Sequence, residues 1–167
     1  MPTSYQILPI KSTFLQRARE HATDDLGQTV ERVLAKGGEP CRDALRRAEP
    51  GEELILASYC PFEIDGPYKE YGPVFILAHA NQQSSPVNRL PVNGTNAYFG
   101  MQFVLRAYSA SERILDACLS SPELCEEDIQ RYFRNREIAF ILVRFAAYGC
   151  YGCRIERTVD LKKAEAH

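Results

Sequence analysis

The sequence predicts an α+β domain with a mainly antiparallel sheet of hairpin-linked strands, two N-terminal helices and one helix before a C-terminal hairpin. Helical spacing of apolar residues is confined to the N-terminal part and to a segment after residue 120. The remaining strand-like segments follow one another through polar or glycine-containing turns, without the strand–helix alternation of a parallel sheet. We expect one domain over residues 1–167, with residues 161–167 forming a frayed tail.

Two helices are expected near the N-terminus. The first begins at Ser12, whose hydroxyl is suited to an N-cap. The second follows Thr23 and ends at Gly37. Its apolar residues recur at helical spacing: Leu26, Val30, Val33 and Leu34. A shorter helical turn is expected over residues 41–47.

Six segments are expected to be strands: 53–59, 74–79, 102–108, 113–119, 138–145 and 153–159. The fourth fits helix or strand, and we favour a strand because Ser109–Glu112 suits a hairpin connection. A helix should begin at Ser121–Pro122, with acidic residues in its first turn and basic residues in its last. The last two strands should form a hairpin, and the polar stretch 81–96 is expected to be a long loop, mobile or functional.

The net charge and the distribution of apolar residues argue against nucleic acids and membranes as partners. A net charge of −2 lacks the positive excess typical of nucleic-acid or membrane-binding surfaces, so neither partner is predicted. No signal peptide is expected, and no window approaches the roughly 18 apolar residues of a membrane-spanning helix. We therefore expect a cytoplasmic protein whose six cysteines are mostly reduced. The oligomeric state is left open.

Cys150 and Cys153 form a CxxC pattern with three interpretations. A redox motif needs a helix N-terminus to activate its first thiol, whereas the residues that follow alternate like a strand. Structural zinc needs four ligands, and the other cysteines are too widely spaced for a second pair: Cys41, Cys60, Cys118 and Cys125. We favour packed reduced thiols, and no metal, cofactor or catalytic residue is predicted.

A thiol site is nevertheless conceivable at Cys41 and Arg42. A guanidinium group beside a thiol, near the start of a helical turn, favours the thiolate. If Cys41 met Cys150 in space, the two could form a reversible disulfide, or a nucleophile with a resolving partner. The alternative is that Cys41 is simply a small buried hydrophobic residue.

Arginines on apolar strands provide the leading functional hypothesis. Arg106 and Arg144 interrupt strands that are otherwise apolar, and Arg154 begins the partner strand of the final hairpin. A buried charge requires a carboxylate, backbone carbonyls or a ligand anion. Together with Tyr108 and Tyr148, these arginines could bind a small carboxylate or phosphate. The alternative is internal pairing, for which three acids are candidates: Glu53, Asp116 and Glu156.

Several segments together resemble a bacterial family catalogued as domain of unknown function 1203. They are Gly38–Arg42, Pro50–Leu54, Ser58–Phe62, Pro67–Tyr68, Gly72–Phe75, Leu105–Tyr108, Val143–Arg144, Tyr148–Cys150 and Arg154–Glu156. The resemblance implies a stand-alone, single-domain bacterial protein and supplies no activity, substrate or cofactor.

Three classes of function therefore remain. The first is recognition of a small anionic ligand through the strand arginines. The second is a thiol-based enzyme or redox switch that uses Cys41 and Cys150. The third is a structural or interaction module, which predicts an exposed apolar patch and no pocket.

Overall fold

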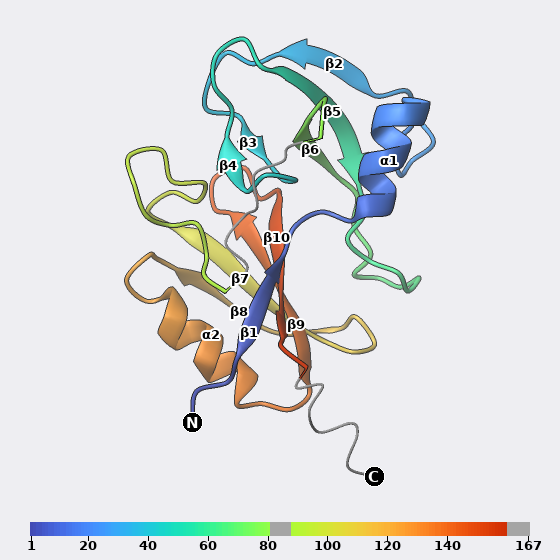
Figure 1. Cartoon of the computed structure of the whole chain (residues 1–167). Coiled ribbons are helices and arrows are strands. Elements are labelled where there is room, and N and C mark those ends of the chain that lie inside the picture. The colour runs from blue at the N-terminus through green and yellow to red at the C-terminus, as the bar shows by residue number, and fades with distance from the viewer. Residues whose placement is uncertain (81–87, 160–167) are drawn as a thin grey trace.

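The computed structural model describes residues 1–80 and 88–159, and these residues form two five-stranded sheets and two helices (Figure 1). The first sheet has the order β1-β10-β9-β7-β8 and is antiparallel throughout. Its strands are β1 (Tyr5–Leu8), β7 (Phe103–Ser109), β8 (Ile114–Ser120), β9 (Ile138–Phe145) and β10 (Tyr151–Arg157).

The second sheet has the order β2-β5-β6-β3-β4. Its strands are β2 (Glu31–Leu34), β3 (Pro40–Cys41), β4 (Arg46–Arg47), β5 (Glu53–Tyr59) and β6 (Gly72–Leu77). β3 lies parallel to β6, and the other pairs are antiparallel. The mainly antiparallel α+β class is therefore confirmed.

The two helices each cover part of one sheet. Helix α1 (Ser12–His21) lies beside β5, and α2 (Cys125–Phe133) lies against the first sheet (Figure 1). The predicted acidic first turn of α2 is present as Glu126, Glu127 and Asp128. These carboxylates complement the positive end of the helix dipole. Helices are thus confirmed at both places, but the predicted serine caps are wrong: Lys11 and Leu124 occupy the N-cap positions without a side-chain cap hydrogen bond, and α2 begins at Cys125.

The prediction of a second N-terminal helix between Thr23 and Gly37 is wrong. A tight turn replaces its beginning, because the Asp24 carboxylate accepts hydrogen bonds from the backbone N–H groups of Leu26 and Gln28 at 3.0 and 2.9 Å. An Asp side chain that binds nearby backbone N–H groups in this way competes with the helix. β2 then pairs with β5, so the apolar residues at helical spacing do not share one buried face.

Residues 41–47 also differ from the expected short helix. A single turn, closed by a 2.8 Å hydrogen bond from Leu45 N to Cys41 O, connects β3 to β4. The predicted helical turn is therefore the tip of a two-stranded hairpin. The expected tail, 161–167, and the start of the long polar loop, 81–87, lie outside the described residues.

The first sheet separates two cores. One face packs against α2 through residues such as Leu105, Val143 and Ile155. The opposite face carries Phe140 and Leu142 into a second core that it shares with α1, β5 and β6. The polar residues of that second face therefore lie where the two sheets meet, instead of in open solvent.

A bulge at Gly152 sets the geometry of the closing hairpin. Tyr151 pairs with Arg144 and Cys153 pairs with Val143, so Gly152 is the extra residue. A Cβ atom at this position would lie 2.5 Å from Cε1 of Phe99. The ring of Phe99 is fully buried, so it has little room to move away.

Gly152→Ala should therefore destabilise the protein by about 1–3 kcal/mol, because overpacking in a filled core costs that much. Chemical denaturation measures the free energy of unfolding. Gly66→Ala is the matched control, since nothing lies within 4 Å of a Cβ added there. Equal stability of the two variants would contradict this account of the bulge.

Candidate functional site

Arg42 is the most deeply buried arginine among the described residues, with 2% of its surface exposed. It follows β3 directly, and its backbone N–H donates to Phe75 O of β6 at 3.0 Å. This bond holds the residue at the edge of the second sheet. The side chain extends from there to the turn between β9 and β10 of the first sheet.

Three polar atoms and one aromatic ring surround the Arg42 guanidinium group. Nε donates to Tyr151 O at 2.8 Å and Nη1 donates to Pro40 O at 2.7 Å. Nη2 donates to the sulfur of Cys150 at 3.0 Å. The ring of Phe145 lies 5.1 Å from the guanidinium carbon. Arg42 thus connects the two sheets through a contact with a thiol.

No carboxylate in the described part of the chain pairs with Arg42. Carbonyl oxygens and an aromatic face solvate a guanidinium group without neutralising it. A buried charge without an opposite charge costs several kcal/mol. Of the groups in contact with Arg42, Cys150 alone can ionise to an anion.

Cys150 differs from the buried cysteines in its environment. It is partly exposed at the end of the hairpin turn, directly before β10. Burial raises the pKa of Cys41 to about 12, with the Asp43 carboxylate as the next cause. Burial also raises the pKa values of Cys60, Cys125 and Cys153. These four thiols are therefore protonated at neutral pH.

The three residues of the predicted thiol site are only partly brought together. Arg42 contacts Cys150, whereas the Cys41 side chain lies in a separate apolar cluster and its thiol contacts Glu39 O at 3.6 Å. All six cysteines are free. Cys153 lies on the opposite face of the sheet from Tyr151, in the core beneath α2.

The strand arginines share one face of the first sheet, toward the second. Arg106 and Arg154 both lie in register with Leu142, one on each side of it. Arg106 Nη1 lies 3.3 and 3.4 Å from the two carboxylate oxygens of Glu70. Nη2 of Arg144 lies 2.7 Å from Glu70 Oε2 as an ion pair, although not in hydrogen-bonding geometry. One carboxylate thus serves two guanidinium groups.

The other predicted ligand residues make their contacts with other partners or with solvent. Arg154 donates to Glu156 at 2.6 Å and its guanidinium carbon lies 3.6 Å from the centre of the Phe140 ring. Tyr108 is fully buried and stacks on Phe140 at 5.0 Å. Tyr148 is 90% exposed on the hairpin turn. Each of the three guanidinium groups therefore has a carboxylate within ion-pair distance, and Glu156 is one of the expected partners.

Glu70 belongs to the 60–71 loop, and a second carboxylate fixes that loop to the first sheet. Glu112, in the β7–β8 turn, accepts hydrogen bonds from the backbone N–H groups of Glu63 and Ile64 at 2.9 Å. Glu112 is only 8% exposed and has a φ of 59°. The loop is thereby held over the face that carries Arg106 and Arg144.

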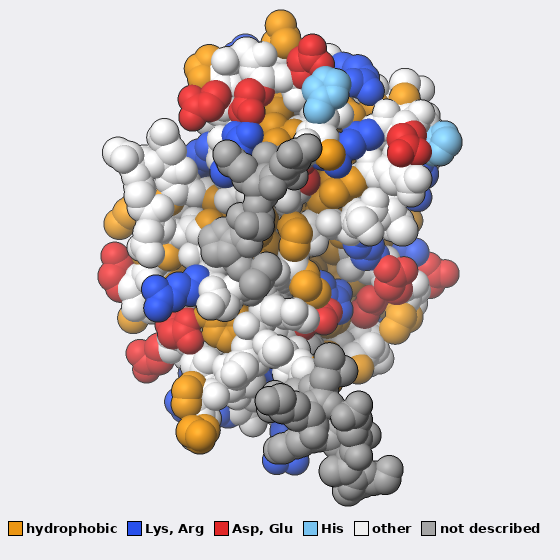
Figure 2. Space-filling view, viewed as in Figure 1, with side chains coloured by type: hydrophobic (Ala, Val, Ile, Leu, Met, Phe, Trp, Pro, Cys, Tyr) orange, Lys and Arg blue, Asp and Glu red, His pale blue; other side chains and the backbone are white. Residues whose placement is uncertain are grey.

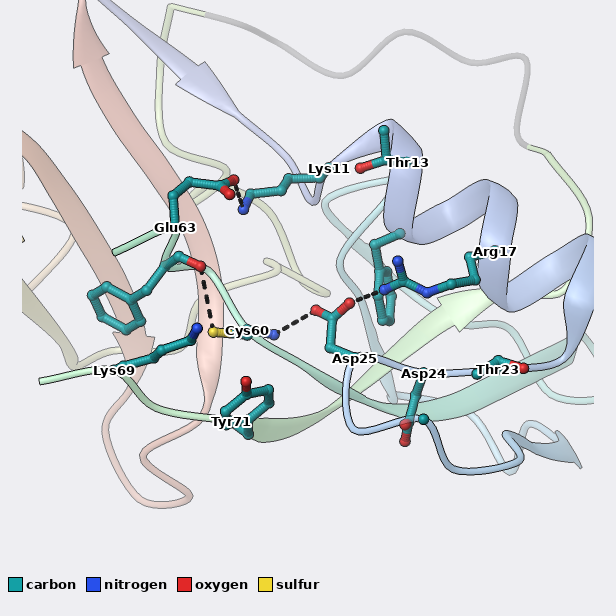
Figure 3. Close-up of a pocket in the computed structure, with 13 residues that line it drawn as sticks. Lys11, Thr13, Arg17, Thr23, Asp24, Asp25, Cys60, Glu63, Lys69 and Tyr71 are labelled. Atoms are coloured by element: carbon teal, nitrogen blue, oxygen red, sulfur yellow. Dashed lines mark hydrogen bonds and ion pairs between the residues drawn. The ribbon is translucent and has the colours of Figure 1, made fainter. Parts of the chain in front are cut away.

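A separate cleft of about 480 Å³ lies between α1, the 23–27 turn and the 60–71 loop (Figure 3). Its three basic side chains have carboxylate partners: Lys11 with Glu63, Arg17 with Asp25 and Lys69 with Asp65. Cys60, which lines the cleft, directs its thiol to Phe62 O at 3.5 Å. The basic side chains of the cleft are thus paired with carboxylates, and its thiol is protonated.

The rest of the described surface is of mixed charge. Acidic and basic side chains are interspersed over the visible face, without a continuous field of one sign (Figure 2). No group of acidic, cysteine and histidine side chains in the described residues is arranged to hold a metal ion. Within residues 1–80 and 88–159, neither helix is long and apolar enough to cross a membrane.

Sequence reasoning missed three residues that shape these sites. Glu70, the shared partner of Arg106 and Arg144, lies in a loop without any pattern that marks it. The sequence placed Phe145 only at the end of an expected strand and gave Tyr98 no role. Tyr98 donates to Gly152 O at 2.8 Å and packs on the Phe145 ring at 5.2 Å, so it supports the ring beside Arg42.

The fold and the site together define a two-sheet α+β protein with a buried arginine–cysteine contact between its sheets. Residues 38–157 match a family described as protein of unknown function (DUF1203). The chain belongs to this family, since the match covers more than two thirds of it and confirms the resemblance noted above. The matched segment contains Arg42, Glu70, Arg106, Arg144 and Cys150. No curated protein and no solved structure matches the chain significantly.

The hairpin that carries Arg42 depends on a bidentate ion pair. Arg46 donates to both carboxylate oxygens of Glu52, at 2.9 and 2.8 Å, and Glu49 N donates to Glu52 at 2.7 Å. The Arg46 guanidinium group is the main reason that the pKa of Glu52 falls to about 2.

Glu52→Gln should lower the free energy of unfolding by about 1 kcal/mol at neutral pH. Because the pKa is lowered in the folded state, the wild-type advantage should be complete above pH 4.5 and disappear as the pH falls toward 2. Urea unfolding of both proteins over this range measures it. A difference that does not change with pH would contradict the assignment.

Proposed function

We propose that the protein carries out thiol chemistry at Cys150, with Arg42 as the counter-ion of its thiolate. The observation that carries this proposal is the 3.0 Å contact between a buried guanidinium group and this sulfur. Thiolates are the reactive form of cysteine, and adjacent cations favour them. The partial exposure of Cys150 supports access of a small reactant.

The charge on Arg42 makes the proposal physically specific. A neutral thiol would leave the guanidinium group buried among two carbonyls and a phenyl ring. A thiolate would convert the same contact into an ion pair, with opposite charges on the guanidinium group and the sulfur. The contact therefore places a fixed positive charge at the sulfur on which we propose that the reaction occurs.

The reaction that this site supports best is thiol–disulfide exchange with a small disulfide. The Cys150 thiolate attacks one sulfur of the disulfide and forms a mixed disulfide. The bond between the two original sulfurs breaks, and the second sulfur leaves with the electron pair as a thiolate. An external thiol, as its thiolate, then attacks the substrate-derived sulfur of the mixed disulfide. A new small disulfide forms, and Cys150 leaves as a thiolate. This assignment uses Cys150 without Cys41, which is protonated and directed elsewhere.

Recognition of a small anion by the strand arginines is the second candidate. Its support is that Arg106 and Arg144 face a single carboxylate, so that positive charge is in excess there. It ranks below the thiol function because Glu70 and Glu156 already supply internal partners. In addition, the Tyr148 side chain is exposed, and no hydrogen bond within the described residues joins it to the arginines.

Iodoacetamide should modify Cys150 before the other five cysteines at neutral pH, as measured by peptide mass spectrometry against time. Arg42→Met should slow this reaction by about 10- to 100-fold, the equivalent of one charge-assisted hydrogen bond. Arg42→Lys keeps a positive charge without the planar guanidinium group and should give an intermediate rate.

Arg47→Met is the matched control. Arg47 comes from the same hairpin, and within the described residues its side chain donates to the carbonyl oxygens of Gly38, Ala97 and Tyr98. It should leave the Cys150 rate unchanged, and circular dichroism establishes that each variant is folded. A folded Arg42→Met protein that reacts as fast as wild type would refute the proposal.

A further inference from the structure

The Arg106–Arg144 pair lies next to the turn that carries Cys150. Nη1 of Arg144 donates to Gly149 O at 3.3 Å, and Cys150 is the following residue. Arg144 also lies in register with Tyr151, whose carbonyl oxygen accepts a hydrogen bond from Arg42. Residues 149–151 are therefore contacted by both Arg144 and Arg42.

Glu70 is a poorly fitted partner for these two arginines. Its contacts with Arg106 are long, at 3.3 and 3.4 Å, and its short contact with Arg144 lacks hydrogen-bonding geometry. Nε of Arg144 has no hydrogen-bond partner in the described residues, although only 7% of the surface of this residue is exposed. A well-fitted carboxylate would instead form short, linear bonds with two guanidinium groups.

The charge balance at this position is also incomplete. Two guanidinium groups share one carboxylate, so a net positive charge remains beside the buried face of the sheet. The Glu70 side chain is 44% exposed and belongs to a loop, whereas the Arg144 side chain is 8% exposed on a central strand. The cation is thus fixed and the anion is accessible to solvent and to exchange.

We propose that Arg106 and Arg144 form a carboxylate subsite for the substrate of Cys150, and that Glu70 occupies this subsite in the free protein. The substrate class is then a small disulfide that carries a carboxylate. The carboxylate would replace that of Glu70 while the disulfide reaches the sulfur at the adjacent turn. This inference rests on the proposed thiol function for its second half, whereas the carboxylate subsite is testable by itself.

Chemical rescue tests the subsite without any reaction at Cys150. Glu70→Ala removes the carboxylate, and acetate supplies the lost group. Acetate should raise the melting temperature of Glu70→Ala by several degrees more than that of wild type, where Glu70 competes. The double variant Glu70→Ala/Arg106→Gln should lose this extra stabilisation. An equal response of all three proteins to acetate would refute the subsite.

Disulfide specificity tests the link to Cys150. The rates of mixed-disulfide formation are compared for dithiodiglycolate, which carries carboxylates, and hydroxyethyl disulfide, which is neutral. Glu70→Gln should raise the ratio of the two rates about three- to tenfold, and Arg106→Gln should lower it by a similar factor. Arg131→Gln on α2 removes the same charge away from this face and is the matched control.

The outcomes separate the two proposals. If Cys150 reacts with neither disulfide, the thiol function fails, and with it the role of the subsite in that chemistry. If Cys150 reacts with both but the ratio is the same in all variants, the thiol function stands and the subsite inference is overturned. Changes in the ratio limited to Glu70→Gln and Arg106→Gln support both.

Discussion

The burial of one guanidinium group constrains this protein more than any other single interaction. The Arg42 side chain leaves the second sheet and crosses to the first, and within the described residues its guanidinium group donates to the first sheet and to its own hairpin. Three features support the guanidinium group: the Phe145 ring, the Tyr98 ring that packs on it, and the bulge at Gly152, whose carbonyl oxygen accepts a hydrogen bond from the Tyr98 hydroxyl. An anion would complete the neutralisation of this charge, and of the described groups in contact with Arg42 we propose Cys150 for that role.

The second polar cluster follows from the same arrangement of sheets. The face of the first sheet that meets the second is mostly apolar, and Arg106 and Arg144 stand within it. Such residues are expensive unless paired, and the 60–71 loop brings Glu70 to them. The loop is in turn fixed by Glu112. The two clusters meet at the β9–β10 turn, which makes one composite site a simpler interpretation than two unrelated structural devices.

Local patterns predicted the parts of the fold that depend on local physics. Alternation and turn residues identified β5 to β10, and the order of acidic and basic residues identified α2. The failed helix after Thr23 shows the limit, because the Asp24 carboxylate formed a turn and pairing with β5 then decided the outcome. Sequence also singled out Cys41, Arg42 and Cys150. It had no means to tell which sulfur the guanidinium group would reach, because that contact joins residues 108 positions apart. Glu70 could not be identified from the sequence for the same reason, because its contacts also join residues that are far apart in the chain.

The ionisation state of Cys150 tests the central claim most directly. Thiolates absorb in the far ultraviolet and thiols do not, so the absorbance lost on acidification counts them in the native protein. The account predicts that wild type at neutral pH contains one thiolate that is missing in Cys150→Ser and in a folded Arg42→Met variant. Identical absorbance changes in all three proteins would contradict it, since Arg42 would then be buried beside a neutral thiol.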